Sequence, residues 1–141
     1  IIAFSVSAAE YNWLLETIKK IKNKINKIII VGGPFPTFHP DIIKEDLIDI
    51  ICIGEGELPR VELLERLERN EDITNIRNLW VKKDGKIFKN PVRDLIDDLD
   101  SLPFADRHIY EKYPFFKLIN YDTFMAGRGC VGRCTFCFNN K

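Results

Sequence analysis

Three cysteines near the end of the sequence, Cys130, Cys134 and Cys137, have the chemistry and spacing of a metal-binding loop. Thiolates are soft ligands, and C-x3-C-x2-C spacing brings three of them onto one face of a loop. Three protein ligands on a four-iron cluster leave one iron open, and an open iron can bind a substrate or a cofactor. The spacing therefore favours a [4Fe–4S] cluster with a vacant ligand position.

Two other readings of these thiols remain open, namely a different metal and purely structural cysteines. A structural zinc site uses four ligands, usually paired cysteines. Cys52 could supply a fourth, but it lies in an apolar run that resembles a strand. Disulfides are disfavoured because the N-terminal run lacks the basic start of a signal peptide. We therefore expect a reducing, cytoplasmic setting.

The composition is that of a soluble globular protein. The chain has 141 residues, of which 45% are hydrophobic and 30% charged, and its formal net charge is zero. Zero net charge does not indicate a nucleic-acid partner, and no apolar run reaches the roughly 18 residues of a membrane span. The sequence opens directly in a strand-like run, so we expect a piece of a longer protein.

The first half of the sequence alternates between strand and helix patterns. Continuous apolar runs at 28–31 and 48–53 are typical of strands in a parallel sheet covered on both faces. A helix is predicted at 58–69, and another by apolar residues at three- and four-residue steps: Tyr11, Leu14, Leu15, Ile18, Ile21 and Ile25. This order predicts an α/β fold with a doubly wound parallel sheet, in which the two apolar runs are parallel neighbours joined by a right-handed crossover.

The second half does not continue the alternation of strand and helix patterns. Asp84-Gly85 between two apolar-polar runs predicts a β-hairpin. Residues 90–120 contain spaced prolines with many apolar residues, which favours an ordered linker, and residues 121–126 are typical of a strand that leads into the cysteine loop. We therefore expect three parts: a doubly wound domain at 1–75, a hairpin and linker at 76–120, and the start of a second domain at 121–141.

Small residues follow each of the three expected parallel strands. Ligands of doubly wound sheets bind beyond the carboxyl ends of the strands, and glycine lets backbone approach a ligand closely. Neither phosphate-binding glycine fingerprint is present. Tight strand-to-helix turns are the alternative explanation of the glycines. The candidate cofactor-binding residues at these strand ends are Ser5, Ser7, Gly32, Gly33, Pro34, Thr37, Gly54, Glu55 and Gly56.

These motifs together resemble the cobalamin-dependent radical S-adenosylmethionine (radical SAM) enzymes. The cysteine motif with Phe136 before its last cysteine, the Gly-Gly-Pro-x-x-Thr turn, the Gly-Glu-Gly-Glu turn and Leu102-Pro103 occur in the order of that family. The resemblance implies a Rossmann-like cobalamin-binding domain, truncated at its N-terminus, followed by the first strand and cluster loop of a partial β/α TIM-like barrel. It places Ser5 and Ser7 near the corrin or its nucleotide tail, residues 32–37 along that tail, and residues 54–56 at the cofactor edge.

The implied chemistry is reductive cleavage of S-adenosylmethionine by the [4Fe–4S] cluster and, with cobalamin, radical methylation or a related rearrangement. An electron donor such as flavodoxin or ferredoxin and a small-molecule or unknown substrate would be the partners. The D-x-H-x-x-G motif of other cobalamin proteins is absent, and His39 and His108 are expected to be turn or surface residues. We assign no catalytic residue in this part of the enzyme and expect it to be inactive alone. A non-catalytic α/β binding module with a cysteine metal knuckle is the alternative.

Overall fold

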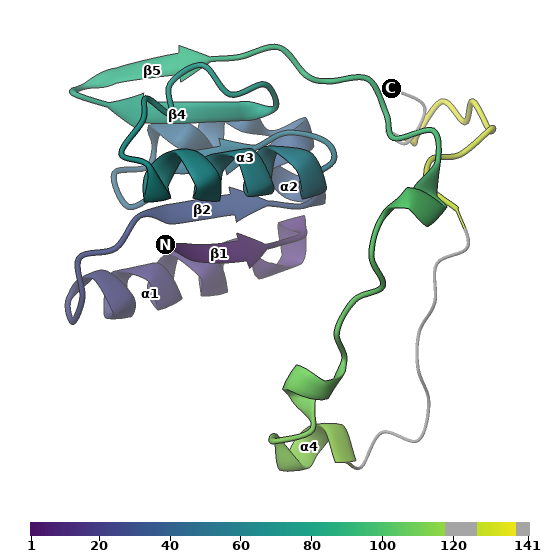
Figure 1. Ribbon diagram of the computed structural model, residues 1–141, viewed down its shortest axis with the longest axis horizontal. Helices are drawn as coiled ribbons and strands as arrows, with labels where there is room; N and C mark the ends of the chain where they lie inside the picture. Colours follow the sequence, from purple (N-terminus) through teal and green to yellow (C-terminus); the bar gives the residue numbers. More distant parts are fainter. Residues whose placement is uncertain (118–126, 138–141) are drawn as a thin grey trace. The chain divides into compact units, whose positions relative to one another are not determined.

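A computed structural model describes residues 1–117 and 127–137. The chain divides into two compact units, Ile1–Leu95 and Ile96–Lys141. The first unit holds a single five-stranded sheet (Figure 1). The strand expected at 121–126 lies outside the described residues.

The sheet contains three parallel strands followed by an antiparallel hairpin. Its strands, in spatial order, are β1 (Ile2–Ser5), β2 (Ile29–Gly32), β3 (Ile50–Cys52), β4 (Leu79–Lys83) and β5 (Lys86–Lys89). β2 pairs in parallel with both β1 and β3, with Ile30 opposite Ile50 and Val31 opposite Ile51. The two apolar runs are therefore parallel neighbours, and the α/β fold class predicted from the sequence is confirmed.

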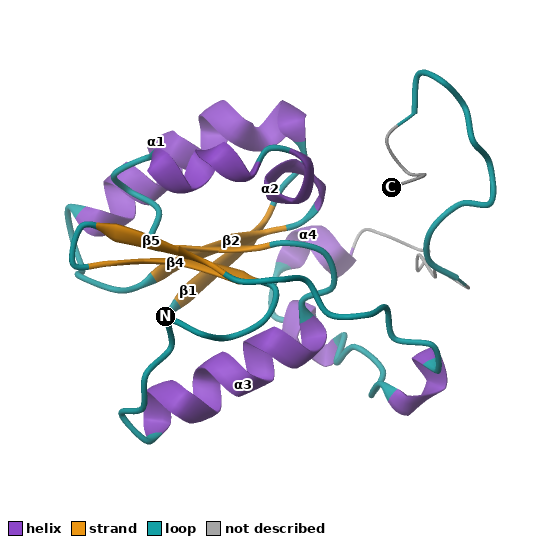
Figure 2. Cartoon of the chain, turned by 90° about the horizontal axis from the view of Figure 1, so that it is seen from above, coloured by secondary structure: helices purple, strands orange, loops and turns teal. Residues whose placement is uncertain are grey.

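Helices cover both faces of this sheet (Figure 2). One face carries α1 (Tyr11–Lys22) and α2 (Pro34–Phe38), and the other carries α3 (Glu57–Glu68). The 3-10 helix η1 (Ala8–Glu10) leads into α1, and η2 (Pro40–Lys44) contributes Ile42 and Ile43 to the same core as α1. Successive residues of β2 belong to different cores: Ile29 and Val31 pack with α1, and Ile30 packs with α3. The continuous apolar runs are thus explained by burial on both faces.

The first helix is shorter than its apolar spacing indicated. α1 ends at Lys22, and Ile25, expected on its buried face, is 47% exposed. The Ile21 carbonyl accepts hydrogen bonds from the backbone N–H groups of Lys24 and Ile25 at 2.8 and 2.9 Å. These bonds close the last turn, because the chain must then reverse to reach β2.

The predicted hairpin is present, and it extends the sheet rather than accompanying the linker. Asp84 and Gly85 form its turn with φ of 51° and 73°. β4 pairs antiparallel with β3, and its residues Leu79 and Val81 complete the core beneath α3. Without this strand, β3 would present an apolar open edge.

The second unit contains short helices: η3 (Leu99–Ser101), η4 (His108–Tyr110) and α4 (Pro114–Lys117). We expected its apolar residues to be buried, but Phe104 and Phe115 are 98% and 66% exposed. The aromatic rings near its middle contact one another instead, with Tyr110 and Phe116 centroids 4.9 Å apart. Because the described part of this unit contains only short helices, it offers little surface against which these aromatic side chains could be buried.

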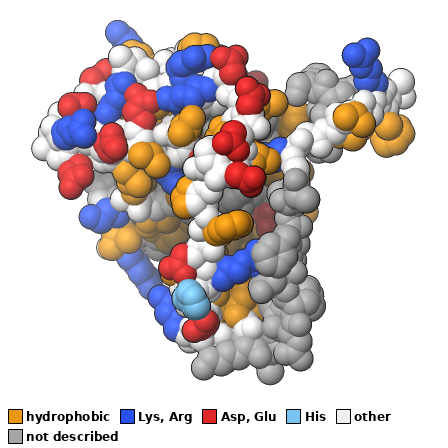
Figure 3. Space-filling view, turned by 45° about the vertical axis from the view of Figure 1, so that its right-hand side comes forward, with side chains coloured by type: hydrophobic (Ala, Val, Ile, Leu, Met, Phe, Trp, Pro, Cys, Tyr) orange, Lys and Arg blue, Asp and Glu red, His pale blue; other side chains and the backbone are white. Residues whose placement is uncertain are grey.

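The described surface carries charges of both signs. Acidic and basic side chains are interspersed over the face shown in Figure 3, as expected from the zero net charge. Among the described residues, no helix is long and apolar enough to span a bilayer.

Candidate functional site

The carboxyl ends of β1, β2 and β3 meet at one edge of the sheet, because the three strands are parallel. We call the segments at these strand ends the first turn (residues 5–7), the second turn (32–37) and the third turn (54–57). All nine candidate cofactor residues lie in these turns. We call this region the carboxyl edge.

Backbone hydrogen bonds join the first turn to the second. The Val6 N–H donates to the Gly32 carbonyl at 3.0 Å, and the Phe35 N–H donates to the Val6 carbonyl at 3.1 Å. Gly33, between them, has φ of 95°, and a Cβ there would lie 2.8 Å from the Val6 nitrogen and 2.8 Å from the Ser5 Oγ. Only glycine fits this position.

This contact changes the interpretation of Gly33. The sequence suggested that the missing side chain leaves room for a nucleotide tail, but the space beside its Cα is filled by the backbone of the first turn. A Gly33→Val change would therefore disrupt the protein itself. Pro34 begins α2, where its fixed φ and missing N–H carry no cost.

The hydroxyl of Thr37 joins the second turn to the third. Its Oγ1 donates to the Gly33 carbonyl at 2.9 Å and accepts from the Gly54 N–H at 3.1 Å. One hydroxyl therefore links the second turn to the third by hydrogen bonds. Because its only proton is donated to the Gly33 carbonyl, Thr37 positions the two turns and does not donate to a ligand.

The two serines of the first turn differ in their surroundings. Ser5 is exposed at the end of β1. The Ser7 backbone N–H and hydroxyl both donate to the Glu10 carboxylate, at 2.7 and 2.9 Å. These bonds lower the pKa of Glu10 below its ordinary value. Ser7 thus caps the start of η1, a role that explains its residue type without a cofactor.

The third turn packs over the end of β3. Gly54 is exposed with φ of 75°, and Gly56 directly precedes α3. The Cys52 thiol beneath it lies 3.8 Å from the Glu55 carbonyl oxygen. Burial raises the pKa of Cys52 to about 11, so this cysteine is a core thiol.

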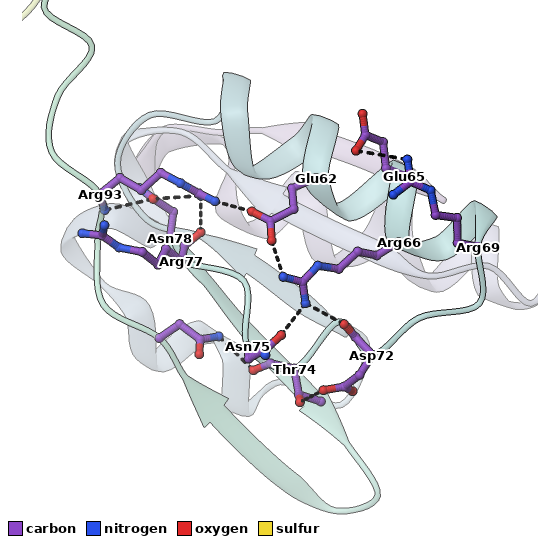
Figure 4. Close-up of polar contacts among 11 residues, drawn as sticks. Glu62, Glu65, Arg66, Arg69, Asp72, Thr74, Asn75, Arg77, Asn78 and Arg93 are labelled. Carbon is purple, nitrogen blue, oxygen red and sulfur yellow. Dashed lines mark hydrogen bonds and ion pairs between the residues drawn. The ribbon is translucent and has the colours of Figure 1, made fainter.

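Asn78 is a residue of the edge that the sequence did not reveal. It is only 2% exposed, and a Cβ on Gly54 would lie 3.5 Å from its Nδ2. Its side chain also contacts Arg93, whose guanidinium reaches Glu62 on α3; Glu62 in turn binds Arg66 (Figure 4). A single buried polar residue has no periodic signature, so spacing alone could not have identified it.

The cysteine loop is described by itself, as part of the second unit. Gly132 lies between two of the thiols: a Cβ on it would be 3.3 Å from the Cys130 Sγ and 3.8 Å from the Cys134 Sγ. The Cys137 N–H donates to the Cys134 carbonyl at 3.1 Å, closing a tight turn. Within residues 1–117 and 127–137, no three metal-ligating side chains are gathered closely enough to hold an ion. The three-thiol ligand set stays a prediction, although two of its members flank one glycine.

Within the residues that the structure describes, neither histidine belongs to a group of side chains that could hold a metal ion. The His39 ring packs on Phe35, with centroids 5.0 Å apart. His108 pairs with Glu111 at 2.7 Å in the second unit, and this contact raises the pKa of His108.

Comparison with known proteins shows similarity to cobalamin-binding proteins. Residues 1–64 match the B12-binding domain. The chain is 33% identical over 129 residues to the uncharacterized methyltransferase PH0819 of Pyrococcus horikoshii, covering 86% of this chain and 28% of that protein. This chain therefore resembles B12-binding domains over its first 64 residues and a protein named a methyltransferase over most of its length.

Two further proteins are similar to this chain. The anaerobic magnesium-protoporphyrin IX monomethyl ester cyclase of Synechocystis is 31% identical over 115 residues, which are 79% of this chain and 23% of the cyclase. The cobalamin-dependent radical SAM enzyme OxsB has the same fold over 67% of this chain and 14% of its own, with a TM-score of 0.56 and 21% identity. The chain thus spans about a quarter of the curated relatives that it matches.

Thr37→Val tests the link between the glycine turns. Valine keeps the shape of threonine but removes the acceptor of the Gly54 N–H, so we expect the Gly54 amide to exchange its hydrogen roughly fivefold faster, equivalent to about 1 kcal/mol for one hydrogen bond. Thr37→Ser keeps the hydroxyl and should preserve protection. Unchanged exchange at residues 54–57 in Thr37→Val would contradict the assigned role.

Cys52 should be the least reactive cysteine of the folded protein. Its raised pKa disfavours the thiolate, so at pH 8 iodoacetamide should label the exposed Cys130 and Cys134 first. Labelling of Cys52 should accelerate only as the pH rises toward about 11. Mass spectrometry of the folded and the urea-unfolded protein gives the comparison. Equal rates at Cys52 and Cys130 in the folded protein at pH 8 would show that Cys52 is not buried.

Proposed function

We propose that the carboxyl edge holds cobalamin and that the cysteine loop holds a [4Fe–4S] cluster, in an enzyme that uses S-adenosylmethionine for radical methylation or a related rearrangement. The observation that carries the cobalamin proposal is the joining of three small-residue turns at one edge of a B12-binding domain. The substrate, a small molecule or another compound, is unassigned, and an electron donor such as flavodoxin or ferredoxin belongs to the same proposal.

The residues of the carboxyl edge fit a large planar ligand. Ser5 and Gly54 are exposed and small; Ser5 ends β1 and Gly54 lies just beyond β3, and β2 with its second turn lies between these strands. Hydrogen bonds already fix the turns before a ligand arrives, which reduces the entropy lost on binding. Two relatives support this reading: PH0819 is named a methyltransferase, and OxsB was solved with aqua-cobalamin and S-adenosylmethionine bound.

The cysteine loop offers the donor set for the cluster. Cys130 and Cys134 are exposed, and Gly132 allows both sulfurs to lie against its backbone. Cys52 lies in the core of the sheet as a protonated thiol, so it is not a suitable fourth ligand. Three thiolates leave one iron free to bind S-adenosylmethionine, and the cluster, when bound, supplies the electron for its cleavage. The protein's own part is to hold the cluster and shield it. A cytoplasmic setting suits these reduced thiols.

A titration of hydroxocobalamin into the full-length protein, followed by visible absorbance, tests the cofactor. We expect stoichiometric binding by the wild type. Ser5→Phe places a large ring at the carboxyl edge and should weaken binding by about tenfold or more. Lys86→Phe adds the same ring beside the hairpin turn, near the amino end of β3, and should bind normally. No binding by the wild type would exclude a cobalamin role for this domain.

Anaerobic reconstitution with iron and sulfide tests the cluster. The full-length protein should hold about four irons and four sulfides. Replacing any one of Cys130, Cys134 or Cys137 by Ala should abolish this content, because each supplies one ligand. Cys52→Ala is the matched control and should retain the metal. Loss of metal only in Cys52→Ala would show that the ligand set is wrong.

A further inference from the structure

We propose that Asn78 is a positioning residue that fixes the third turn for cobalamin; the inference rests on the proposed function of the carboxyl edge. Asn78 directly precedes β4, outside the segment that matches the B12-binding domain. It is the only buried polar residue in the described part of the chain. Its side chain and backbone form hydrogen bonds with two segments of the chain, one before the third turn and one after β5.

On one side, Asn78 forms hydrogen bonds with Ile53, the residue that precedes the third turn. Its Nδ2 donates to the Ile53 carbonyl at 2.8 Å, and its own carbonyl accepts from the Ile53 N–H at 2.8 Å. Gly54 follows at once, and a Cβ there would touch both the Asn78 Nδ2 and the Val92 Cγ1, at 3.5 and 3.4 Å. Two side chains therefore hold the third turn in place: Asn78 binds Ile53, the residue before it, and Thr37 binds the Gly54 N–H.

On the other side, Asn78 holds the chain that follows β5. Its N–H donates to the Pro91 carbonyl at 2.9 Å, and its Oδ1 accepts from the Arg93 N–H at 3.0 Å. The Arg93 guanidinium also donates to the Arg77 carbonyl at 2.6 Å and pairs with Glu62 on α3. Asn78, just before β4, therefore joins the residue after β3, Ile53, to the segment after β5, at residues 91–93.

The residue type suits these demands. Asn78 has φ of 72°, a conformation that asparagine tolerates better than most residues. Its amide supplies one donor and one acceptor in the directions that Ile53 and Arg93 require. Loss of the donor would leave the partly buried Ile53 carbonyl with one partner fewer. The third turn would then be free to shift away from the place that a cofactor needs.

Two substitutions separate positioning from folding. Asn78→Gly keeps the positive φ and removes the amide. Asn78→Asp keeps the acceptor for Arg93, but it replaces the donor to Ile53 with a carboxylate oxygen and adds a negative charge. Asn70→Gly is the matched control, because Asn70 also has positive φ, at 54°, but is exposed beyond α3. All variants are made in the full-length protein and checked by circular dichroism.

Hydroxocobalamin titration and hydrogen exchange of the cofactor-free protein give the readouts. We expect both Asn78 variants to bind about tenfold more weakly, as loss of a buried hydrogen bond allows. Residues 54–57 should exchange faster, while residues 33–35 keep their protection. Asn70→Gly should match the wild type in both.

Three results would overturn the inference, and they differ from one another. Folded Asn78 variants that bind cobalamin like the wild type would remove the role of Asn78 and leave the proposed function intact. Failure of both variants to fold would make Asn78 a residue of the fold alone. Failure of the wild type to bind would remove the cobalamin site itself, and with it the role that depends on it.

Discussion

Because β1, β2 and β3 run parallel, their carboxyl ends must meet at one edge, and every proposed cofactor contact depends on that register. Hydrogen bonds between the turns convert this proximity into a fixed surface. The backbone of Val6 binds both Gly32 and Phe35, and the Thr37 hydroxyl carries the link onward to Gly54. The glycines at 33 and 54 are required because the chain takes positive φ there.

The antiparallel hairpin is more than an extension of the sheet. β4 buries the second edge of β3, and the residue before it, Asn78, supports the third turn. Residues 91–93 return from β5 to the same place, where Arg93 connects Asn78 with Glu62 of α3. The carboxyl edge therefore draws on segments from both ends of the first unit. A domain cut after α3 would lose this support.

Much of the fold could be predicted from the sequence, because burial on both faces leaves a continuous apolar run and a tight turn leaves Asp84-Gly85. Pairing between distant strands leaves no such local mark, so the union of the hairpin with β3 was not foreseen. The candidate cofactor residues lie together at the strand ends, and their role in binding stays a prediction. The sequence did not reveal the local contacts of single residues: Ser7 caps a helix, and Gly33 accommodates Val6. Asn78 could not be predicted from the sequence, because a single buried amide produces no periodic pattern of residue types. The cysteine ligands stay a prediction.

Hydrogen exchange of the full-length protein with and without hydroxocobalamin tests the central claim most directly. The account predicts protection at residues 5–7, 33–37 and 54–57, all at the carboxyl edge. Asn70, Glu71, Ile73 and residues 81–83 help to line a groove of about 420 Å³ at the opposite edge and should not change. Protection confined to that groove, with none at the three turns, would contradict the account.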